Sequence, residues 1–194
     1  MNLALVLAGG KGTRMGTSIP KQYIEYDGKP ILVHTLEAFD QNPHVDKIFV
    51  ICPADSLEYT QKIVSEHDIK KVAWIAAGGN SRRESSYIGV SLLACEYDKN
   101  DIVLIHDGVR PIVTDDTITN NIICAKEKGS AITCTKFFET PIISIGGDIV
   151  EDSPNRDNFY TAQAPQTFVL GDVIEAHLST RKANPDYEGV IDTC

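Results

Sequence analysis

The sequence predicts an α/β fold with three layers, in which a mostly parallel sheet is covered by helices on both faces. Short apolar runs alternate with amphipathic stretches of helical period along most of the chain. Such alternation builds βαβ units, and successive units form a parallel sheet. The alternation is interrupted between Thr140 and Pro154, where we expect an inserted β-hairpin arm.

The predicted strands are apolar runs of strand length. The first, Leu3–Ala8, runs into a cluster of glycines, as a strand that enters a tight turn does. The others are likewise short, apolar and bounded by polar residues or turn formers. In chain order, these others are Lys47–Cys52, Val72–Ala76, Ile102–Ile105 and Ser130–Thr135.

The predicted helices lie between these strands. Ile31–Phe39 carries apolar residues at helical spacing on one face, and Asp55–Glu66 fits the next helix. Ser81-Arg82-Arg83-Glu84 is a capping-box pattern, which begins a helix that ends at about position 97. Thr114 followed by two aspartates begins another helix, which ends near Gly129.

The predicted arm consists of two short apolar strands around a glycine turn. The strands are Pro141–Ile145 and Ile149–Val150, and the turn is Gly146-Gly147-Asp148. No internal repeat or low-complexity segment marks a domain boundary. We therefore expect a single domain over residues 1–194, with the arm at about 139–155.

The composition excludes several classes of protein. The formal net charge of −9 argues against a nucleic-acid partner and against binding to an anionic membrane surface. No apolar run is long enough to span a bilayer, and the apolar start of the chain lacks the basic leader of a signal peptide, so we expect a cytoplasmic protein. The five cysteines lack the spacing of zinc ligands, so we expect reduced thiols that are mostly buried.

The loop after the first strand combines glycines with cations, as polyphosphate-binding loops do. Gly9, Gly10 and Gly12 permit a tight bend that points backbone N–H groups at an anion. The P-loop pattern is absent, and the dinucleotide-binding fingerprint is broken because Met15 stands where its third glycine or alanine belongs. The alternative is an ordinary glycine turn with solvated basic residues. The cations are Lys11, Arg14 and Lys21.

Two further loops follow predicted strands, at the edge of the sheet where ligands bind. Gly78-Gly79-Asn80 comes first, with Ser85 a few residues later; the second is His106-Asp107-Gly108-Val109-Arg110-Pro111. Asp107 stands at the end of its strand, where an active-site acid belongs, and Arg110 can brace it or bind an acceptor hydroxyl. The alternatives are a solvent-facing helical turn for Ser85 and Arg82, and an internal ion pair for Asp107.

Six segments, in order along the chain, resemble those of nucleotidyltransferases that activate sugars and polyols. Gly9-Gly10-x-Gly12-Thr13-Arg14-Met15 and Pro20-Lys21-Gln22-Tyr23 are similar to the signature of CTP-dependent polyol-phosphate cytidylyltransferases. This family contains 2-C-methyl-D-erythritol 4-phosphate and ribitol-5-phosphate cytidylyltransferases, which serve isoprenoid and teichoic acid or capsule biosynthesis. The other matching segments are Gly78-Gly79-Asn80-x-Arg82, Val103-x-x-His106-Asp107-x-x-Arg110-Pro111, Asn155-Arg156 and Gln163-x-Pro165-Gln166-x-Phe168.

The resemblance implies a Rossmann-like nucleotidyltransferase fold and the transfer of CMP from CTP to a polyol phosphate, with release of pyrophosphate. It implies that Arg14 and Lys21 are catalytic and grip the triphosphate, with Mg²⁺ as cofactor. Asp107 is implied as a third catalytic residue, which binds the metal or an acceptor hydroxyl. The residues implied in nucleotide binding, the last three of them near the cytosine, are Leu7, Ala8, Gly9, Gly10, Gly12, Thr13, Gly79, Asn80 and Ser85.

The resemblance also implies how the acceptor is bound. Arg110, Thr140 and Arg156 are the implied acceptor-binding residues, and the last two flank the predicted arm. An isolated two-stranded hairpin is marginal in water, so the arm needs a surface to pack on. We expect a homodimer in which each arm reaches the site of the other subunit. The alternative is a hairpin packed on its own domain, with Arg156 in a surface ion pair.

Departures from the family pattern leave the acceptor open. Asn80 stands where the isoprenoid enzyme usually has Asp, Gly108-Val109 where it has Ala-Ala, and Ala164 where it has Thr. The expected acceptor is therefore either 2-C-methyl-D-erythritol 4-phosphate or ribitol 5-phosphate. The family continues past the position of Cys194, so we expect that its C-terminal segment is missing here, although Asp192 matches a family acid. The alternatives are a hexose-1-phosphate nucleotidyltransferase that uses another nucleoside triphosphate and a non-catalytic nucleotide-binding homologue.

Overall fold

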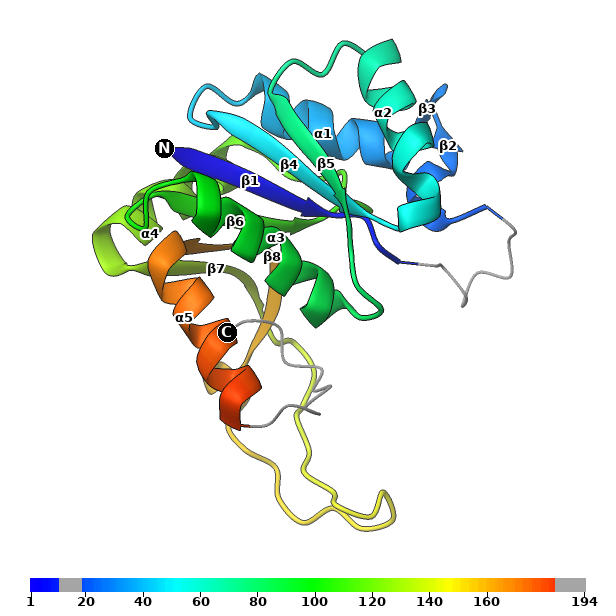
Figure 1. Ribbon diagram of the computed structural model, residues 1–194. Coiled ribbons are helices and arrows are strands. Elements are labelled where there is room, and N and C mark those ends of the chain that lie inside the picture. The colour runs from blue at the N-terminus through cyan, green and yellow to red at the C-terminus, as the bar shows by residue number, and fades with distance from the viewer. Residues whose placement is uncertain (11–18, 184–194) are drawn as a thin grey trace.

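The computed structural model describes residues 1–10 and 19–183, and it confirms the predicted α/β fold (Figure 1). The main strands are β1 (Asn2–Leu7), β4 (Lys47–Cys52), β5 (Val72–Ala77), β6 (Ile102–Asp107), β7 (Ser130–Lys136) and β8 (Tyr160–Val169). They form a six-stranded sheet in the order β5-β4-β1-β6-β8-β7. The first four run parallel, whereas β8 pairs antiparallel with both β6 and β7.

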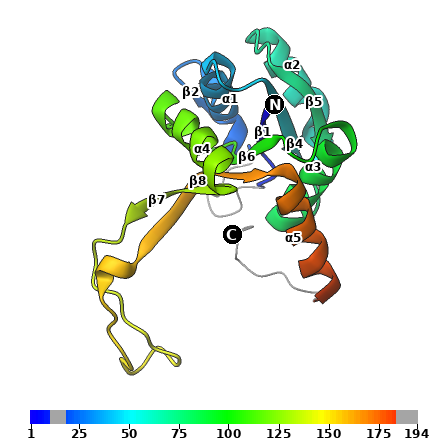
Figure 2. The same ribbon diagram turned by 90° about the vertical axis from the view of Figure 1, so that its left-hand side faces the viewer.

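Helices cover both faces of this sheet, as predicted. They are α1 (Ile31–Gln41), α2 (Leu57–Glu66), α3 (Arg82–Glu96), α4 (Asp115–Lys128) and α5 (Leu170–Ala183). Buried residues of α1, α2 and α4 belong to one apolar core, and those of α3 and α5 belong to the other. Figure 2 shows α1 and α4 on one side of the sheet and α3 and α5 on the other.

The central strand β1 shows why this sequence forms a covered sheet. Ala4 and Val6 pack in the core on the side of α1 and α4, while Leu3, Leu5 and Leu7 pack on the side of α3 and α5. Successive side chains of a strand point to opposite faces, so a strand that is covered on both faces must be apolar throughout. The uninterrupted apolar run at the start of the sequence is therefore the pattern of a central parallel strand.

The predicted helix caps are present. The Ser81 hydroxyl accepts a hydrogen bond from the backbone N–H of Glu84 at 3.1 Å and begins α3. The Thr114 hydroxyl accepts one from the N–H of Thr117 at 3.2 Å and begins α4. Gly129 ends α4 with a φ of 90°, in the left-handed region where glycine carries no steric cost.

Three parts of the fold have no counterpart in the sequence prediction. A small hairpin, β2 (Glu25–Tyr26) and β3 (Lys29–Pro30), turns at an aspartate and a glycine that both have positive φ. β8 is buried only towards its end, where it lies between β6 and β7, so its apolar pattern is weak. α5 follows β8 directly and packs against α3.

The predicted arm is an extended chain reversal between β7 and β8, and it projects from the body of the molecule (Figure 1). The prediction of paired strands at Pro141–Ile145 and Ile149–Val150 is wrong. A single antiparallel bridge joins Ile143 to Asp152. The side chains of Ile145 and Ile149 are 88% and 74% exposed. A hairpin with no surface to pack on lacks the apolar burial that stabilises a regular ladder.

Two further observations bear on the composition. Of the cysteines in the described residues, Cys52 is buried and the other three are exposed, so the prediction of mostly buried thiols is wrong. Those three lie on α3, α4 and β7. No helix within the described ranges is long and apolar enough to cross a membrane.

Candidate functional site

The first predicted loop begins at the carboxyl end of β1. The backbone N–H of Ala8 donates to the carbonyl of Ile51 at 2.7 Å, so the chain stays in the sheet up to the first glycine. Leu7 and Ala8 are buried, whereas Gly10 is exposed. The site residues predicted in the rest of this loop, which are Gly12, Thr13 and Arg14, lie outside the described residues.

Lys21, whose predicted role is to grip the triphosphate, lies against this loop. It begins a short 3-10 helix, Lys21–Tyr23. A β-carbon added to Gly10 would lie 3.3 Å from Lys21 Cε and 4.0 Å from its Nζ. The next residue anchors the segment, because the buried Gln22 amide donates from Nε2 to the Ala8 carbonyl at 2.7 Å. Gln22 belongs to the Pro20-Lys21-Gln22-Tyr23 motif, but the sequence predicts no role for it.

The second loop, Gly78-Gly79-Asn80, follows β5 and packs around Ser85. The Ser85 hydroxyl accepts a hydrogen bond from the Gly79 N–H at 3.2 Å. A β-carbon on Gly78 would lie 2.6 Å from this Oγ, and one on Gly9 would lie 3.5 Å from it. Ser85 is 3% exposed and is therefore no solvent-facing residue. The structure thus brings together Gly9, Gly79 and Ser85, three of the residues predicted to bind the nucleotide.

Glu84 closes the second loop from the first turn of α3. Its Oε2 accepts a hydrogen bond from the backbone N–H of Asn80 at 2.7 Å. Its side chain also fills the space beside Gly79, where a β-carbon would overlap it. The capping box that predicted the start of α3 therefore also fixes the backbone of the candidate nucleotide-binding loop.

The third loop carries Asp107 at the end of β6, and two arginines hold its carboxylate. Arg82 donates to Oδ1 from Nε at 3.1 Å and from Nη2 at 2.9 Å. Arg110 donates to Oδ2 from Nε at 2.8 Å, and its Nη1 donates to Gln163 Oε1 at 2.9 Å. The alternative of an internal Asp–Arg pair is therefore present in the structure, together with a second arginine.

The electrostatics of Asp107 favour its ionised form. Burial alone would raise the pKa of the carboxyl, but the guanidiniums of Arg82 and Arg110 outweigh burial and hold that pKa below its ordinary value. The group of two arginines and one carboxylate consequently has a net positive charge near neutral pH. It can therefore attract an anion.

His106 and Gly108 support the backbone of the third loop. Burial lowers the pKa of His106, so its ring is neutral near pH 7, and Nε2 lies 3.0 Å from the carbonyl of Arg110. The N–H of Gly108 donates to the Leu7 carbonyl at 2.9 Å, and the Thr35 hydroxyl donates to the Gly108 carbonyl at 3.0 Å. The bond to Leu7 joins the third loop to the end of β1, and the bond from Thr35 joins it to α1.

Thr140 and Arg156 do not join this cluster within the described residues of the chain. Both are exposed, and Arg156 Nη1 donates to the carbonyl of Phe138 at 3.4 Å, near the start of the arm. The arm leads away from the loops at the carboxyl ends of β1 and β6 (Figure 1). The predicted role of Thr140 and Arg156 in acceptor binding stays a prediction.

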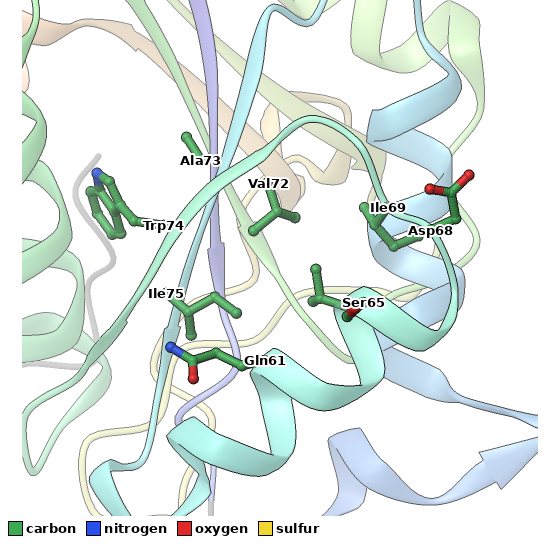
Figure 3. A pocket seen from close by; sticks show the side chains of 9 residues that line it. Gln61, Ser65, Asp68, Ile69, Val72, Ala73, Trp74 and Ile75 are labelled. Carbon is green, nitrogen blue, oxygen red and sulfur yellow. The ribbon is translucent and has the colours of Figure 1, made fainter.

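A separate hollow of about 350 Å³ lies between α2 and the edge strand β5 (Figure 3). Val72 and Ile75 line its strand side, and Gln61 and Ser65 line its helix side. It contains none of the predicted site residues. The three loops, which approach one another at the carboxyl edge of the parallel strands, are therefore the better candidate for a ligand site.

Comparison with known proteins identifies the family. A family model described as 2-C-methyl-D-erythritol 4-phosphate cytidylyltransferase (IspD) matches residues 2–191. The chain belongs to this family. A ribitol-5-phosphate cytidylyltransferase from Vibrio parahaemolyticus is 41% identical over 196 residues, covering 100% of this chain and 81% of the relative. A 2-C-methyl-D-erythritol 4-phosphate cytidylyltransferase from Geobacter metallireducens is 39% identical over 175 residues, covering 90% and 75%.

Solved structures of the family share the fold. A 4-diphosphocytidyl-2C-methyl-D-erythritol synthase from Anaerococcus prevotii superposes with a TM-score of 0.82 at 26% identity, covering 100% of this chain and 79% of that chain. The Francisella tularensis family member gives a TM-score of 0.77 at 31% identity, covering 99% and 82%. The comparisons confirm the predicted resemblance and do not support the hexose-1-phosphate alternative.

The described residues do not form a metal-binding cage. No group of three or more histidine, cysteine or acidic side chains within these residues is placed to hold a metal ion. Both Asp107 oxygens already accept hydrogen bonds from guanidiniums, which a metal ion would have to displace. Mg²⁺ in nucleotide-dependent enzymes is often held largely by substrate phosphates and water. The residues described here fit an ion of that kind better than one held by Asp107.

Proposed function

We propose that this chain transfers CMP from CTP to a polyol phosphate, which gives a CDP-polyol and pyrophosphate. The observation that carries the proposal is the junction of three loops at the carboxyl edge of the sheet. Lys21 lies against the glycine loop, Ser85 lies between the first and second loops, and the Asp107–Arg110 pair follows on the third. Family membership supports cytidylyl transfer as the reaction at this junction.

The proposed reaction needs positioning and charge stabilisation rather than a general base. A phosphate monoester has a second pKa of about 6, so the acceptor is already mostly a dianion at neutral pH. Its oxygen attacks the α-phosphorus of CTP, a new P–O bond forms, and the bond between the α- and β-phosphates breaks to release pyrophosphate. Negative charge builds on the α-phosphate during this step, and cations beside it lower the barrier.

Each loop has a distinct part in this proposal. Backbone N–H groups after β1 and the Lys21 ammonium would bind the triphosphate, with Lys21 also stabilising the charge that develops on the α-phosphate. Ser85 and the Gly79–Asn80 backbone would contact the base. Arg110 would bind the acceptor. Mg²⁺, held mainly by phosphate oxygens, would neutralise part of the charge that separates the two substrates.

We also propose a homodimer in which each arm completes the other subunit's site. Three observations support it: the arm leaves the body of the protein, its isoleucines are highly exposed, and Arg156 has no contact with the Asp107 cluster within the described residues. A group of large exposed apolar side chains on one segment is typical of an interaction site. A two-fold axis would cover both arms reciprocally.

Pyrophosphate release tests the reaction. The assay offers CTP, UTP, ATP or GTP with ribitol 5-phosphate, 2-C-methyl-D-erythritol 4-phosphate or glycerol phosphate. We expect release with CTP and with one of the first two acceptors, both of which occur in the names of relatives. Preference for another nucleotide contradicts cytidylyl transfer. CTP binding without release for any acceptor supports the non-catalytic alternative.

A further inference from the structure

A chain of polar contacts joins three segments that are far apart in the sequence. It runs from Arg82 on the first turn of α3, through Asp107 at the end of β6, to Arg110, and ends at Gln163 on β8. The side chains of Arg82, Asp107 and Arg110 are 36%, 21% and 51% exposed, so Arg110 is the most accessible of the three to the proposed acceptor. We infer that Arg82 is a positioning residue, which acts through Asp107 to orient the Arg110 guanidinium for the polyol-phosphate acceptor. The inference rests on the proposed function.

The Arg110 guanidinium is anchored on two of its three nitrogens. Nε donates to Asp107 Oδ2 and Nη1 donates to Gln163 Oε1. A guanidinium is planar and rigid, so two anchors define the plane and direction of the whole group. Nη2 donates to no atom of the described residues and can meet a phosphate or hydroxyl oxygen. The geometry is that of a binding group whose orientation is set before the ligand arrives.

Arg82 fixes the first of these anchors. Its Nε and Nη2 both donate to Oδ1 of Asp107, which turns Oδ2 towards Arg110. Without Arg82, the Asp107 carboxylate would keep Arg110 as its one strong partner. It could then rotate and bind Arg110 with either oxygen. Arg110 would then lose a defined direction while keeping its charge. Losing this orientation should weaken acceptor binding more than nucleotide binding.

A direct contact between Arg82 and the nucleotide is the competing explanation, because Arg82 lies two residues after the second loop. The two explanations differ in coupling. If Arg82 acts only through Asp107 and Arg110, its removal costs little once Arg110 is gone. If Arg82 binds the nucleotide itself, the effects of the two substitutions multiply.

A double-mutant cycle with Arg82→Met, Arg110→Met and the double variant tests the inference. Acceptor binding is measured calorimetrically in the presence of a CTP analogue with a methylene group between its α- and β-phosphates. We expect each single variant to weaken acceptor binding on the order of 10-fold or more. The double variant should bind the acceptor at most a few fold less tightly than the single variant that binds it less tightly. CTP-analogue affinity should stay within a few fold throughout.

Matched variants keep the result interpretable. Lys62→Met removes a cation from an exposed ion pair on α2 and should leave acceptor binding unchanged. Arg82→Lys keeps the charge and should restore part of the lost affinity; it also replaces Arg82→Met in the cycle if that variant does not fold. Multiplicative effects, or a larger loss of nucleotide than of acceptor affinity, overturn the inference. Wild-type protein that binds the acceptor without releasing pyrophosphate overturns the proposed reaction alone, whereas absence of acceptor binding overturns the inference.

Discussion

Replacement of Gly108 by alanine should destabilise this protein, although alanine is the residue expected at this position from the isoprenoid enzymes of the family. A β-carbon on Gly108 would lie 2.9 Å from Leu32 Cδ1, 3.2 Å from Ala8 Cβ and 3.3 Å from the Leu7 carbonyl oxygen. The first of these distances is shorter than two non-bonded carbon atoms tolerate. Because the backbone is fixed by hydrogen bonds to Leu7 and Thr35, the loop cannot move away without breaking them.

The expected cost follows from the crowding. Inserting one methyl group into a packed core costs about 1–3 kcal/mol in the free energy of unfolding. For a chain of this size, each kcal/mol lowers Tm by about 2–4 °C, so the expected loss is about 2–12 °C. Gly146→Ala is the matched control, since a β-carbon there has no neighbour within 4 Å. Both Gly→Ala substitutions restrict the unfolded chain equally. The difference between the two variants in the free energy of unfolding therefore isolates the packing cost.

Thermal and urea unfolding of both variants measure this difference. Leu32→Val removes a methylene from the neighbour that Gly108→Ala would strike, so the two substitutions together should cost less than the sum of their separate effects. Equal stability of Gly108→Ala and Gly146→Ala would show that the loop adapts and that the crowding argument is wrong. Additive effects of Gly108→Ala and Leu32→Val would place the strain elsewhere.

Lys21→Ala should lower turnover by about 10²–10³-fold and leave CTP affinity within a few fold, because the lysine acts on charge that develops in the transition state; near-normal turnover would make Lys21 a surface lysine. In an equal mixture of Lys21→Ala and Arg156→Ala after subunit exchange, roughly a quarter of the sites should be intact, since half of the dimers are mixed; no recovery despite exchange would show that sites are not shared. Burial, with the nearby Arg83 and Arg181, lowers the pKa of His177 from 6.5 to about 4. The unfolded chain therefore binds more protons between these values, and the free energy of unfolding should decrease as the pH falls through this window. His177→Gln should flatten the Tm profile there, and an unchanged profile would contradict the assignment. A chelator should abolish pyrophosphate release and Mg²⁺ should restore it; release that persists in chelator would exclude the metal.

The framework of the fold could be predicted because its signals are local. Lys47–Cys52 is apolar because both faces of β4 are buried, and the structure gives that strand the predicted bounds. Ser81 and Glu84 signalled the start of α3 because a helix must satisfy its first N–H groups within one turn. The meeting of the three loops also follows from the pattern, since loops after parallel strands share one edge of the sheet.

The parts that could not be predicted depend on partners far along the chain. Arg82 had the pattern of a solvent-facing helical residue, because nothing near it in the sequence indicates its ion pair with Asp107. β8 is exposed where it extends to the arm and buried where it enters the sheet, so no single period describes it. The regular strands predicted for the arm would need a surface to pack on that its own domain does not provide. In each case the deciding interaction is tertiary or, for the arm, proposed to be intermolecular.

The first strand of the chain is also the middle of the parallel part of the sheet, which has a consequence for synthesis. Leu3 pairs with Lys47 on one side and with Val103 on the other. The loop that follows β1 is held in place by residues from β4, from the first turn of α3 and from the end of β6. On the ribosome, β1 and the residues that follow it therefore emerge before β4 and β6, the two strands that pair with β1 in the sheet. Long loops must close before these contacts form, so folding of this domain should be slower than that of a helical bundle of equal size.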